Sequence, residues 1–204
     1  MVRMPKDLRT EAADVRGKIL DTATALFYQH GIRAVGIDLI IEQAGVAKAS
    51  LYRHFATKDD LIAAFAERKD HDFWATWDEV AARHAGDPRA ELDAHLGWIG
   101  ERAGRFDYRG CAQINVAAEF PENDHPARKI ARAHKQQLRR RLADLGVRLG
   151  VGDPDEFAGQ LTLLINGALV SSQLFKPREA IPLLRKTADC LLREAIVSKR
   201  KTRS

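Results

Sequence analysis

The chain has 204 residues, of which 45% are hydrophobic, and this is enough for one large domain or for two small domains that share a core. The formal net charge of +5 favours polyanionic partners, and the two cysteines, Cys111 and Cys190, lie too far apart to indicate a disulfide framework, which favours a reducing compartment. The N-terminus is polar and no apolar run approaches the roughly 18 residues of a membrane span, so we expect a cytoplasmic protein without a secretory signal or membrane anchor.

Helical spacing of apolar residues dominates the chain, and glycines and prolines divide it into about nine segments, which predicts an all-α fold. The first helix is predicted over residues 14–30 and ends at Gly31. Its apolar stripe consists of Ile19, Ala23, Leu26 and Phe27.

Shorter elements follow. Helices are predicted over residues 38–44 and 48–55, separated by a turn at Gly45, and a long helix is predicted over residues 58–84. The five later helices are predicted to begin near Pro88, Tyr108, Pro126, Pro154 and Pro177, and the last to end near Val197. Asp-Pro pairs at two of these starts support the assignment, because Asp is a good N-cap and Pro suits the first helical turn.

The segment from Ile37 to Phe55 has the pattern of a helix-turn-helix, in which one short helix braces on the DNA backbone and the next enters the major groove. Six apolar residues are predicted to pack against the first helix: Leu39, Ile40, Ala44, Val46, Leu51 and Phe55. Lys48, Ser50, Tyr52, Arg53 and His54 would then face outward.

From Arg16 to about Phe65 the sequence resembles the DNA-binding domain of the TetR family of transcriptional regulators, through ILDTATALFYQHGI, AGVAKASLYRHF and TKDDLI. The resemblance implies a helix-turn-helix DNA-binding domain over residues 12–72 and a ligand-binding and dimerisation domain over residues 73–197. A basic tail, 198–204, would follow. It also implies a homodimer that binds double-stranded operator DNA and responds to a small-molecule effector.

Carried over by position, the resemblance implies DNA contacts by nine residues: Gly36, Lys48, Ala49, Ser50, Tyr52, Arg53, His54, Thr57 and Lys58. Lysine and arginine can pair with phosphates or guanine edges, and tyrosine can offer a hydroxyl or a ring. Lys58 and the first N-H groups of its helix suit a phosphate. Alternatively, Tyr52 and His54 close the turn against the first helix.

The sequence departs from the family pattern where hydroxyls normally cap the two short helices. Val35, Gly36 and Ala47 stand at these places, and Ala49 replaces a glycine within the recognition helix. Loss of an N-cap hydroxyl costs about 0.5 to 2 kcal/mol when alanine replaces serine. We therefore expect weaker operator binding, or a contribution from the basic arm at residues 3–9.

The resemblance also implies an effector cavity among the fifth to eighth helices, for an apolar or mixed ligand. Candidate lining residues are Trp77, Trp98, Phe106, Cys111, Asn115, Glu119 and Asn166. Cys111, Asn115 and Glu119 are spaced four apart and would share one face of the predicted sixth helix. Alternatively, the tryptophans fill the core, and Asn115 and Glu119 cap or pair locally.

Small residues of the eighth helix, including Gly159, Gly167 and Ala168, would allow close approach of a second copy. Together with leucines of the ninth helix they predict a four-helix dimer seam.

The predicted function is that of a ligand-responsive repressor, without catalysis, cofactor or metal. No nucleophile or phosphate motif is present, and His71 and Asp72 with His125 or His134 lack a recognised metal spacing. Two other interpretations remain: a helical binding protein that has lost operator recognition, and a small helical enzyme that uses Glu119 or His125.

Overall fold

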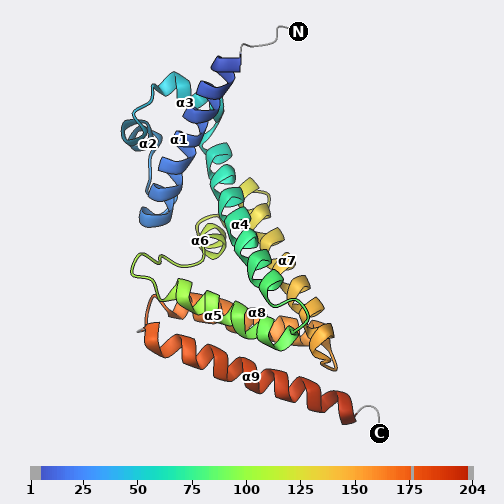
Figure 1. Ribbon diagram of the computed structural model, residues 1–204. Helices are drawn as coiled ribbons and strands as arrows, with labels where there is room; N and C mark the ends of the chain where they lie inside the picture. The colour runs from blue at the N-terminus through green and yellow to red at the C-terminus, as the bar shows by residue number, and fades with distance from the viewer. Residues whose placement is uncertain (1–5, 176, 202–204) are drawn as a thin grey trace. The chain divides into compact units, whose positions relative to one another are not determined.

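The computed structural model describes residues 6–175 and 177–201, with side chains for 14–175 and 181–196, and within these ranges all regular secondary structure is helical (Figure 1). The predicted all-α class is confirmed. In chain order the helices are α1 (Lys6–His30), α2 (Ile37–Ala44), α3 (Lys48–His54), α4 (Lys58–Arg83), α5 (Pro88–Ala103), α6 (Ala112–Glu119), α7 (Pro126–Leu149), α8 (Pro154–Ser171) and α9 (Pro177–Lys201).

Two helix starts differ from prediction by more than one residue. Helix α1 begins at Lys6 rather than near residue 14, because its polar first turns lack the apolar stripe on which the prediction relied. The backbone of residues 6–9 is therefore helical, whereas 3–5 of the predicted basic arm lie outside the described residues, as do 202–204 of the predicted tail. Helix α6 begins at Ala112, after Gly110 with φ +93°. Cys111 therefore lies before the helix, and the prediction that it shares a helix face with Asn115 and Glu119 was wrong.

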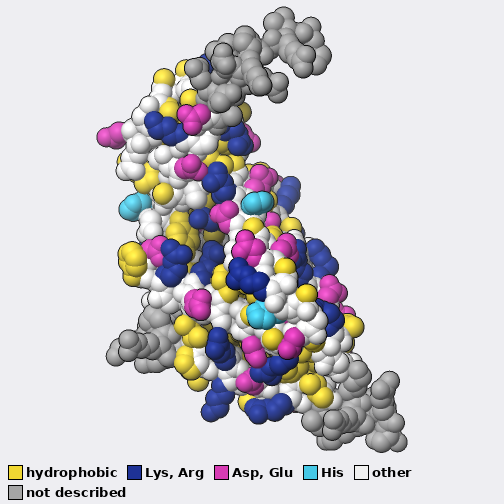
Figure 2. Space-filling view, viewed as in Figure 1, with side chains coloured by type: hydrophobic (Ala, Val, Ile, Leu, Met, Phe, Trp, Pro, Cys, Tyr) yellow, Lys and Arg dark blue, Asp and Glu magenta, His cyan; other side chains and the backbone are white. Residues whose placement is uncertain are grey.

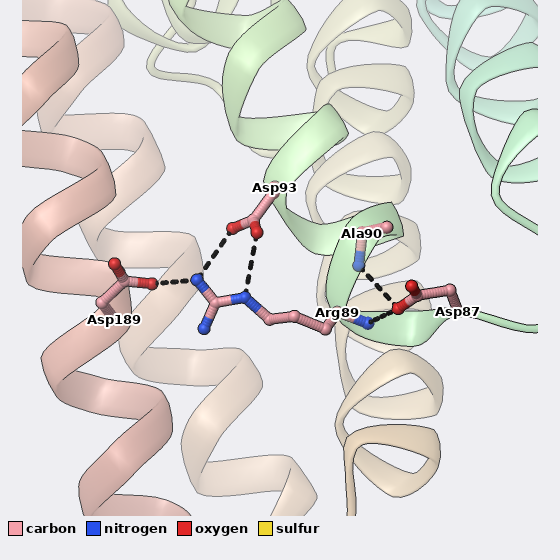
Figure 3. Close-up of polar contacts among 5 residues, drawn as sticks. All are labelled: Asp87, Arg89, Ala90, Asp93 and Asp189. Carbon is pink, nitrogen blue, oxygen red and sulfur yellow. Dashed lines mark hydrogen bonds and ion pairs between the residues drawn. The ribbon is translucent and has the colours of Figure 1, made fainter.

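The Asp-Pro starts of α5 and α8 are confirmed as capped helices. The Asp87 carboxylate accepts hydrogen bonds from the N-H groups of Arg89 (3.1 Å) and Ala90 (2.9 Å), as Figure 3 shows. The Arg89 guanidinium also joins α5 to α9, because it donates to Asp93 of its own helix and to Asp189 of α9 (2.5 Å). This contact fixes the first turn of α5 against α9.

The described chain forms two compact units, each with its own apolar core. The first unit contains the residues up to Asp70 together with Ala112–Ala131, and the second contains His71–Cys111 and the chain from Arg132 onward. Helices α4 and α7 each run through a boundary. This division differs from the predicted domains in one respect, since α6 and the start of α7 belong with the N-terminal helices.

The core of the second unit combines aromatic packing with close helix contacts. Trp77 is buried and stacks on His95 of α5, with ring centroids 3.7 Å apart. At Gly100 of α5, an added Cβ would lie 2.7 Å from Ile181 of α9, so glycine permits the approach of these two helices. Trp74 and Trp77 are therefore core residues, in accordance with the alternative interpretation of the tryptophans.

A buried polar group lies beside this aromatic core. The Glu91 carboxylate accepts two hydrogen bonds from Arg148 of α7 (2.6 and 2.7 Å), and the His95 Nε2 lies 3.7 Å from Glu91 Oε1. Burial alone would raise the pKa of Glu91, but Arg148 outweighs it and the pKa is lowered. Burial lowers the pKa of His95 to about 4, although Glu91 acts in the opposite direction. His95, which is 1% exposed, is therefore neutral in the folded chain at neutral pH.

We expect His95 to make the protein sensitive to mild acid. In the unfolded chain His95 is protonated as the pH falls below about 6.5, whereas in the folded chain it is protonated only near pH 4. The contribution of His95 to the free energy of unfolding should be complete above pH 6.5 and fall by about 3 kcal/mol as the pH approaches 4. His95→Phe, which keeps a ring beside Trp77, should flatten this dependence in urea unfolding at fixed protein concentration.

The control is His71→Gln, which removes an exposed histidine of α4 and should leave the wild-type pH dependence unchanged. Parallel pH profiles for wild type and His95→Phe would contradict the prediction.

Candidate nucleic-acid interface

The helix-turn-helix is built on the apolar stripe of α1. Ile19, Ala23 and Phe27 of α1 are buried in one cluster with Ile40 of α2, and the same cluster contains Leu51 and Phe55. The Arg16 guanidinium lies over the Phe55 ring, 4.9 Å from its centroid. These contacts hold α3, which has seven residues, in a fixed orientation on α1.

The turn between the two short helices depends on Gly45. Its φ of 59° and ψ of 41° are left-handed, a conformation that glycine adopts without a Cβ penalty. The Gly45 N-H donates to the Glu42 carbonyl (3.2 Å) and the Val46 N-H donates to the Ile41 carbonyl (3.2 Å). The end of α2 is therefore satisfied by the backbone, and α3 begins three residues later.

The missing hydroxyl caps are confirmed. Gly36 and Ala47 are the N-caps of α2 and α3, both extended, and neither provides a side-chain hydrogen bond. The start of α4 is different. The Thr57 hydroxyl accepts from the Asp60 N-H (3.1 Å), and the Asp60 carboxylate accepts from the Thr57 N-H (2.9 Å) and hydroxyl (2.8 Å). This reciprocal pair stabilises α4 but gives the Thr57 hydroxyl an internal partner and places a carboxylate beside the predicted phosphate position.

The nine predicted DNA-contact residues lie at the start of α2, on α3 and at the start of α4, and they differ in exposure. Gly36, Lys48, Ala49, Tyr52, Arg53 and Thr57 are exposed, whereas Ser50, His54 and Lys58 are half-buried. The Arg53 guanidinium donates to the Ser50 hydroxyl (3.0 Å). One packing prediction was wrong: Leu39 is 38% exposed, because α2 turns its buried side through Ile40 and Ala44.

Asp38, which the sequence reasoning missed, belongs to the same surface. Its carboxylate lies 3.2 Å from the Lys48 Nζ, and both side chains are largely exposed. The only sequence signal was an acidic residue in the first turn of a helix that precedes a recognition helix. Acidic and basic side chains are also interspersed over the part of the face in Figure 2 that holds the N-terminal helices, so net charge does not mark this interface.

The predicted effector residues of the second unit lie in different surroundings. Trp98 is half-buried and contacts Phe73, with centroids 5.0 Å apart. Phe106 is fully exposed between α5 and α6, and its predicted role in lining a cavity stays a prediction. Cys111 and Asn166 meet at Lys135 of α7, whose Nζ lies 3.7 Å from the thiol and 2.7 Å from the amide oxygen.

Lys135 was missed, because one lysine among eight basic residues of the segment 126–150 carries no signal of its own. The two remaining predicted residues, Asn115 and Glu119, lie on α6 and thus in the first unit. Asn115 is half-buried. Glu119 accepts hydrogen bonds from backbone N-H groups that follow α1, and its predicted effector role stays a prediction.

An apolar groove of about 720 Å³ runs between α8 and α9. Several of its leucines are exposed, including Leu163 (74%) and Leu183 (62%). Small residues, Gly167, Ala168 and Ser171, form part of its wall. The groove is therefore an uncovered apolar face of the kind predicted for the dimer seam.

In the part of the chain that the structure describes, no three His, Cys, Asp or Glu side chains converge as metal ligands would. Likewise, none of the described helices combines the length and apolar character needed to cross a bilayer.

Known proteins resemble the chain over both units. Residues 19–65 match the family model for bacterial regulatory proteins, tetR family. The HTH-type transcriptional repressor SCO4008 of Streptomyces coelicolor is 31% identical over 140 residues, which cover 63% of this chain and 68% of that protein. The crystal structure of SCO4454, a TetR-family transcriptional regulator from Streptomyces coelicolor, has a TM-score of 0.86 and 32% identity, covering 90% of this chain and 97% of that one.

Some other relatives match a shorter part of the chain. The HTH-type transcriptional regulator AcrR of Shigella flexneri is 33% identical over 89 residues, which cover 44% of this chain and 41% of that protein. The chain thus spans less than half the length of the first curated relatives that it matches.

Restoring the missing cap of α3 should stabilise the protein. Ala47 already has the extended backbone of an N-cap, so the hydroxyl of Ala47→Ser can accept from an N-H group of the first turn. We expect the free energy of unfolding to rise by about 0.5 to 2 kcal/mol, measured by urea unfolding. Ala49→Ser, the same change within the helix, is the control. Equal free energies of unfolding for Ala47→Ser and Ala49→Ser would contradict the prediction that a serine at residue 47 caps α3.

Proposed function

Since the chain belongs to the TetR family of bacterial regulatory proteins, we propose that it is a transcriptional repressor that binds a palindromic operator as a homodimer and leaves it when a small molecule binds. The observation that carries this proposal is the presentation of α3, with Lys48, Tyr52 and Arg53 exposed on a helix that is fixed to α1 by buried Leu51 and Phe55. We assign operator binding to the first unit, and effector binding and dimerisation to the second.

The exposed side chains of α3 have the chemistry of groove recognition. Lys48 and Arg53 can bind phosphates or guanine edges, and the Tyr52 ring and hydroxyl can contact a thymine methyl or a phosphate. Lys48 must exchange its contact with Asp38 for a contact with DNA. Because a free carboxylate on this surface repels phosphates, Asp38 penalises DNA that does not offer Lys48 a good partner.

The α8-α9 groove supports the dimer. An apolar face with exposed leucines and small residues suits a self-complementary contact with the same face of a second copy. Two-fold symmetry would then present two copies of α3 to an operator with two half-sites, about 34 to 36 Å apart.

The effector site that we propose lies in the second unit around Lys135, with Asn166, Cys111 and the half-buried Trp98 as further contacts. A lysine and an amide beside aromatic rings suit a ligand with an apolar body and a hydrogen-bond acceptor. Such a ligand releases DNA only if it binds better to a conformer whose recognition helices do not match successive grooves. We propose that this regulator acts in the cytoplasm, on double-stranded operator DNA and without a catalytic role.

The DNA proposal is tested by selecting bound sites from random duplexes and measuring the affinity for the selected site against a scrambled duplex. Lys48→Ala should weaken operator binding about tenfold and make the slope of log K against log salt less negative by about 1.8, as expected for two lost phosphate contacts, one in each half-site of the proposed dimer complex. Lys129→Ala, which removes an exposed lysine of α7, is the control and should change neither quantity. The absence of any sequence preference at physiological salt would overturn the proposed function.

The dimer proposal is tested by placing a charge in the groove. Leu163→Glu should convert the protein to a monomer in light scattering at micromolar concentration, because an uncompensated carboxylate would be buried at the seam. Val147→Glu, at a 65% exposed residue of α7 outside the groove, should remain dimeric. A monomeric wild-type protein would refute the seam.

A further inference from the structure

Within the first unit, the side chain of Glu119, the last residue of α6, binds the connection between α1 and α2. The two carboxylate oxygens of Glu119 accept hydrogen bonds from the N-H groups of Ile32 (Oε1, 3.0 Å) and Arg33 (Oε2, 2.7 Å). These N-H groups lie in the connection between α1 and α2, 87 and 86 residues away in the sequence. Glu119 therefore joins α6 directly to the scaffold of the helix-turn-helix.

The backbone after α1 is shaped for this contact. Gly31 has a φ of 89°, which turns the chain at the end of the helix. A Cβ at Gly31 would lie 3.6 Å from Glu119 Oε1, so the carboxylate packs directly over the glycine. Hydrogen bonds of a carboxylate to backbone N-H groups are charge-assisted and stronger than bonds between neutral groups.

Further contacts make the end of α6 rigid. Phe120, the next residue, stacks on His125 (centroids 4.1 Å apart) and lies beneath the Arg33 guanidinium (5.3 Å). The Arg128 guanidinium donates to the backbone carbonyls of Ala117 (2.5 Å) and Phe120 (2.7 Å). A displacement of α6 must therefore either move the α1-α2 connection with it or break the Glu119 bonds.

The chain passes between the two units at three places. Two lie within the continuous helices α4 and α7, and the third is the peptide bond between Cys111 and Ala112, which is not helical on its Cys111 side. Cys111 contacts Lys135, around which we have proposed the effector site. A change around Lys135 thus has a short covalent route to α6 that does not pass through α4.

We propose that Glu119 is a positioning residue for regulation: it transmits displacement of the chain at Cys111, through α6, to the helix-turn-helix. This inference rests on the proposed function. Coupling between sites is reciprocal, so operator binding must in turn alter the surroundings of Cys111. A residue with a structural role only would affect stability but not this dependence.

The test uses Cys111 as its own reporter. In a Cys190→Ser background, Cys111 is the one remaining thiol of the sequence, and its alkylation by iodoacetamide is followed with and without a saturating duplex that the wild-type protein selected from random DNA. We expect operator to change the alkylation rate about fivefold in the otherwise wild-type chain. In Glu119→Ala, and in Glu119→Gln if the alanine variant does not fold, the ratio of the two rates should be near one.

Glu122→Gln is the matched control, because the exposed Glu122 carboxylate lies 4.0 Å from the Arg33 guanidinium and so approaches a side chain of the same connection rather than its N-H groups. It should keep the fivefold ratio. A wild-type ratio near one, or an undiminished ratio in the Glu119 variants, would overturn the coupling alone. Failure to select any duplex would overturn the proposed function, and the coupling with it.

Discussion

Burial of Leu51 and Phe55 against α1 is the interaction on which the proposed DNA surface depends. A helix of seven residues is far too short to be stable by itself in water. Complete burial of a leucine or phenylalanine side chain contributes roughly 1.5 to 3 kcal/mol, so two such residues can hold the helix in place. The exposed residues of α3 have a defined orientation only because these two do not face the solvent.

Other features of the same surface are unfavourable for the phosphate contacts that we propose. Neither short helix has a side-chain cap, the Thr57 hydroxyl is engaged by Asp60, and Asp38 lies beside Lys48. Each feature removes a donor or adds a negative charge where DNA phosphates would approach. If this surface binds DNA as we propose, it would have little attraction for DNA in general and would gain its affinity from a well-fitted site and from duplication in a dimer.

The second unit has a closely packed core, but part of its apolar surface is exposed to solvent. Buried Glu91 and His95 lie beside stacked aromatic rings, exposed Arg148 donates to the Glu91 carboxylate, and glycines bring α5 close to α9. The outer faces of α8 and α9 instead expose leucines along a groove. Because this apolar area is contiguous, a second copy would complete the packing that one chain leaves unfinished.

The sequence by itself determined the fold class, most helix starts and the helix-turn-helix, since apolar periodicity, Asp-Pro starts and Gly45 act through neighbouring residues. It also indicated the missing caps, which depend on single positions. Only the tertiary structure decided the partners of Glu119, the exposure of Phe106, the contact of Lys135 with Cys111, and the membership of α6 in the first unit. The physical reason is that periodicity states which side of a helix is buried but not against what, and a carboxylate can find its N-H partners 87 residues away only when the fold brings them together.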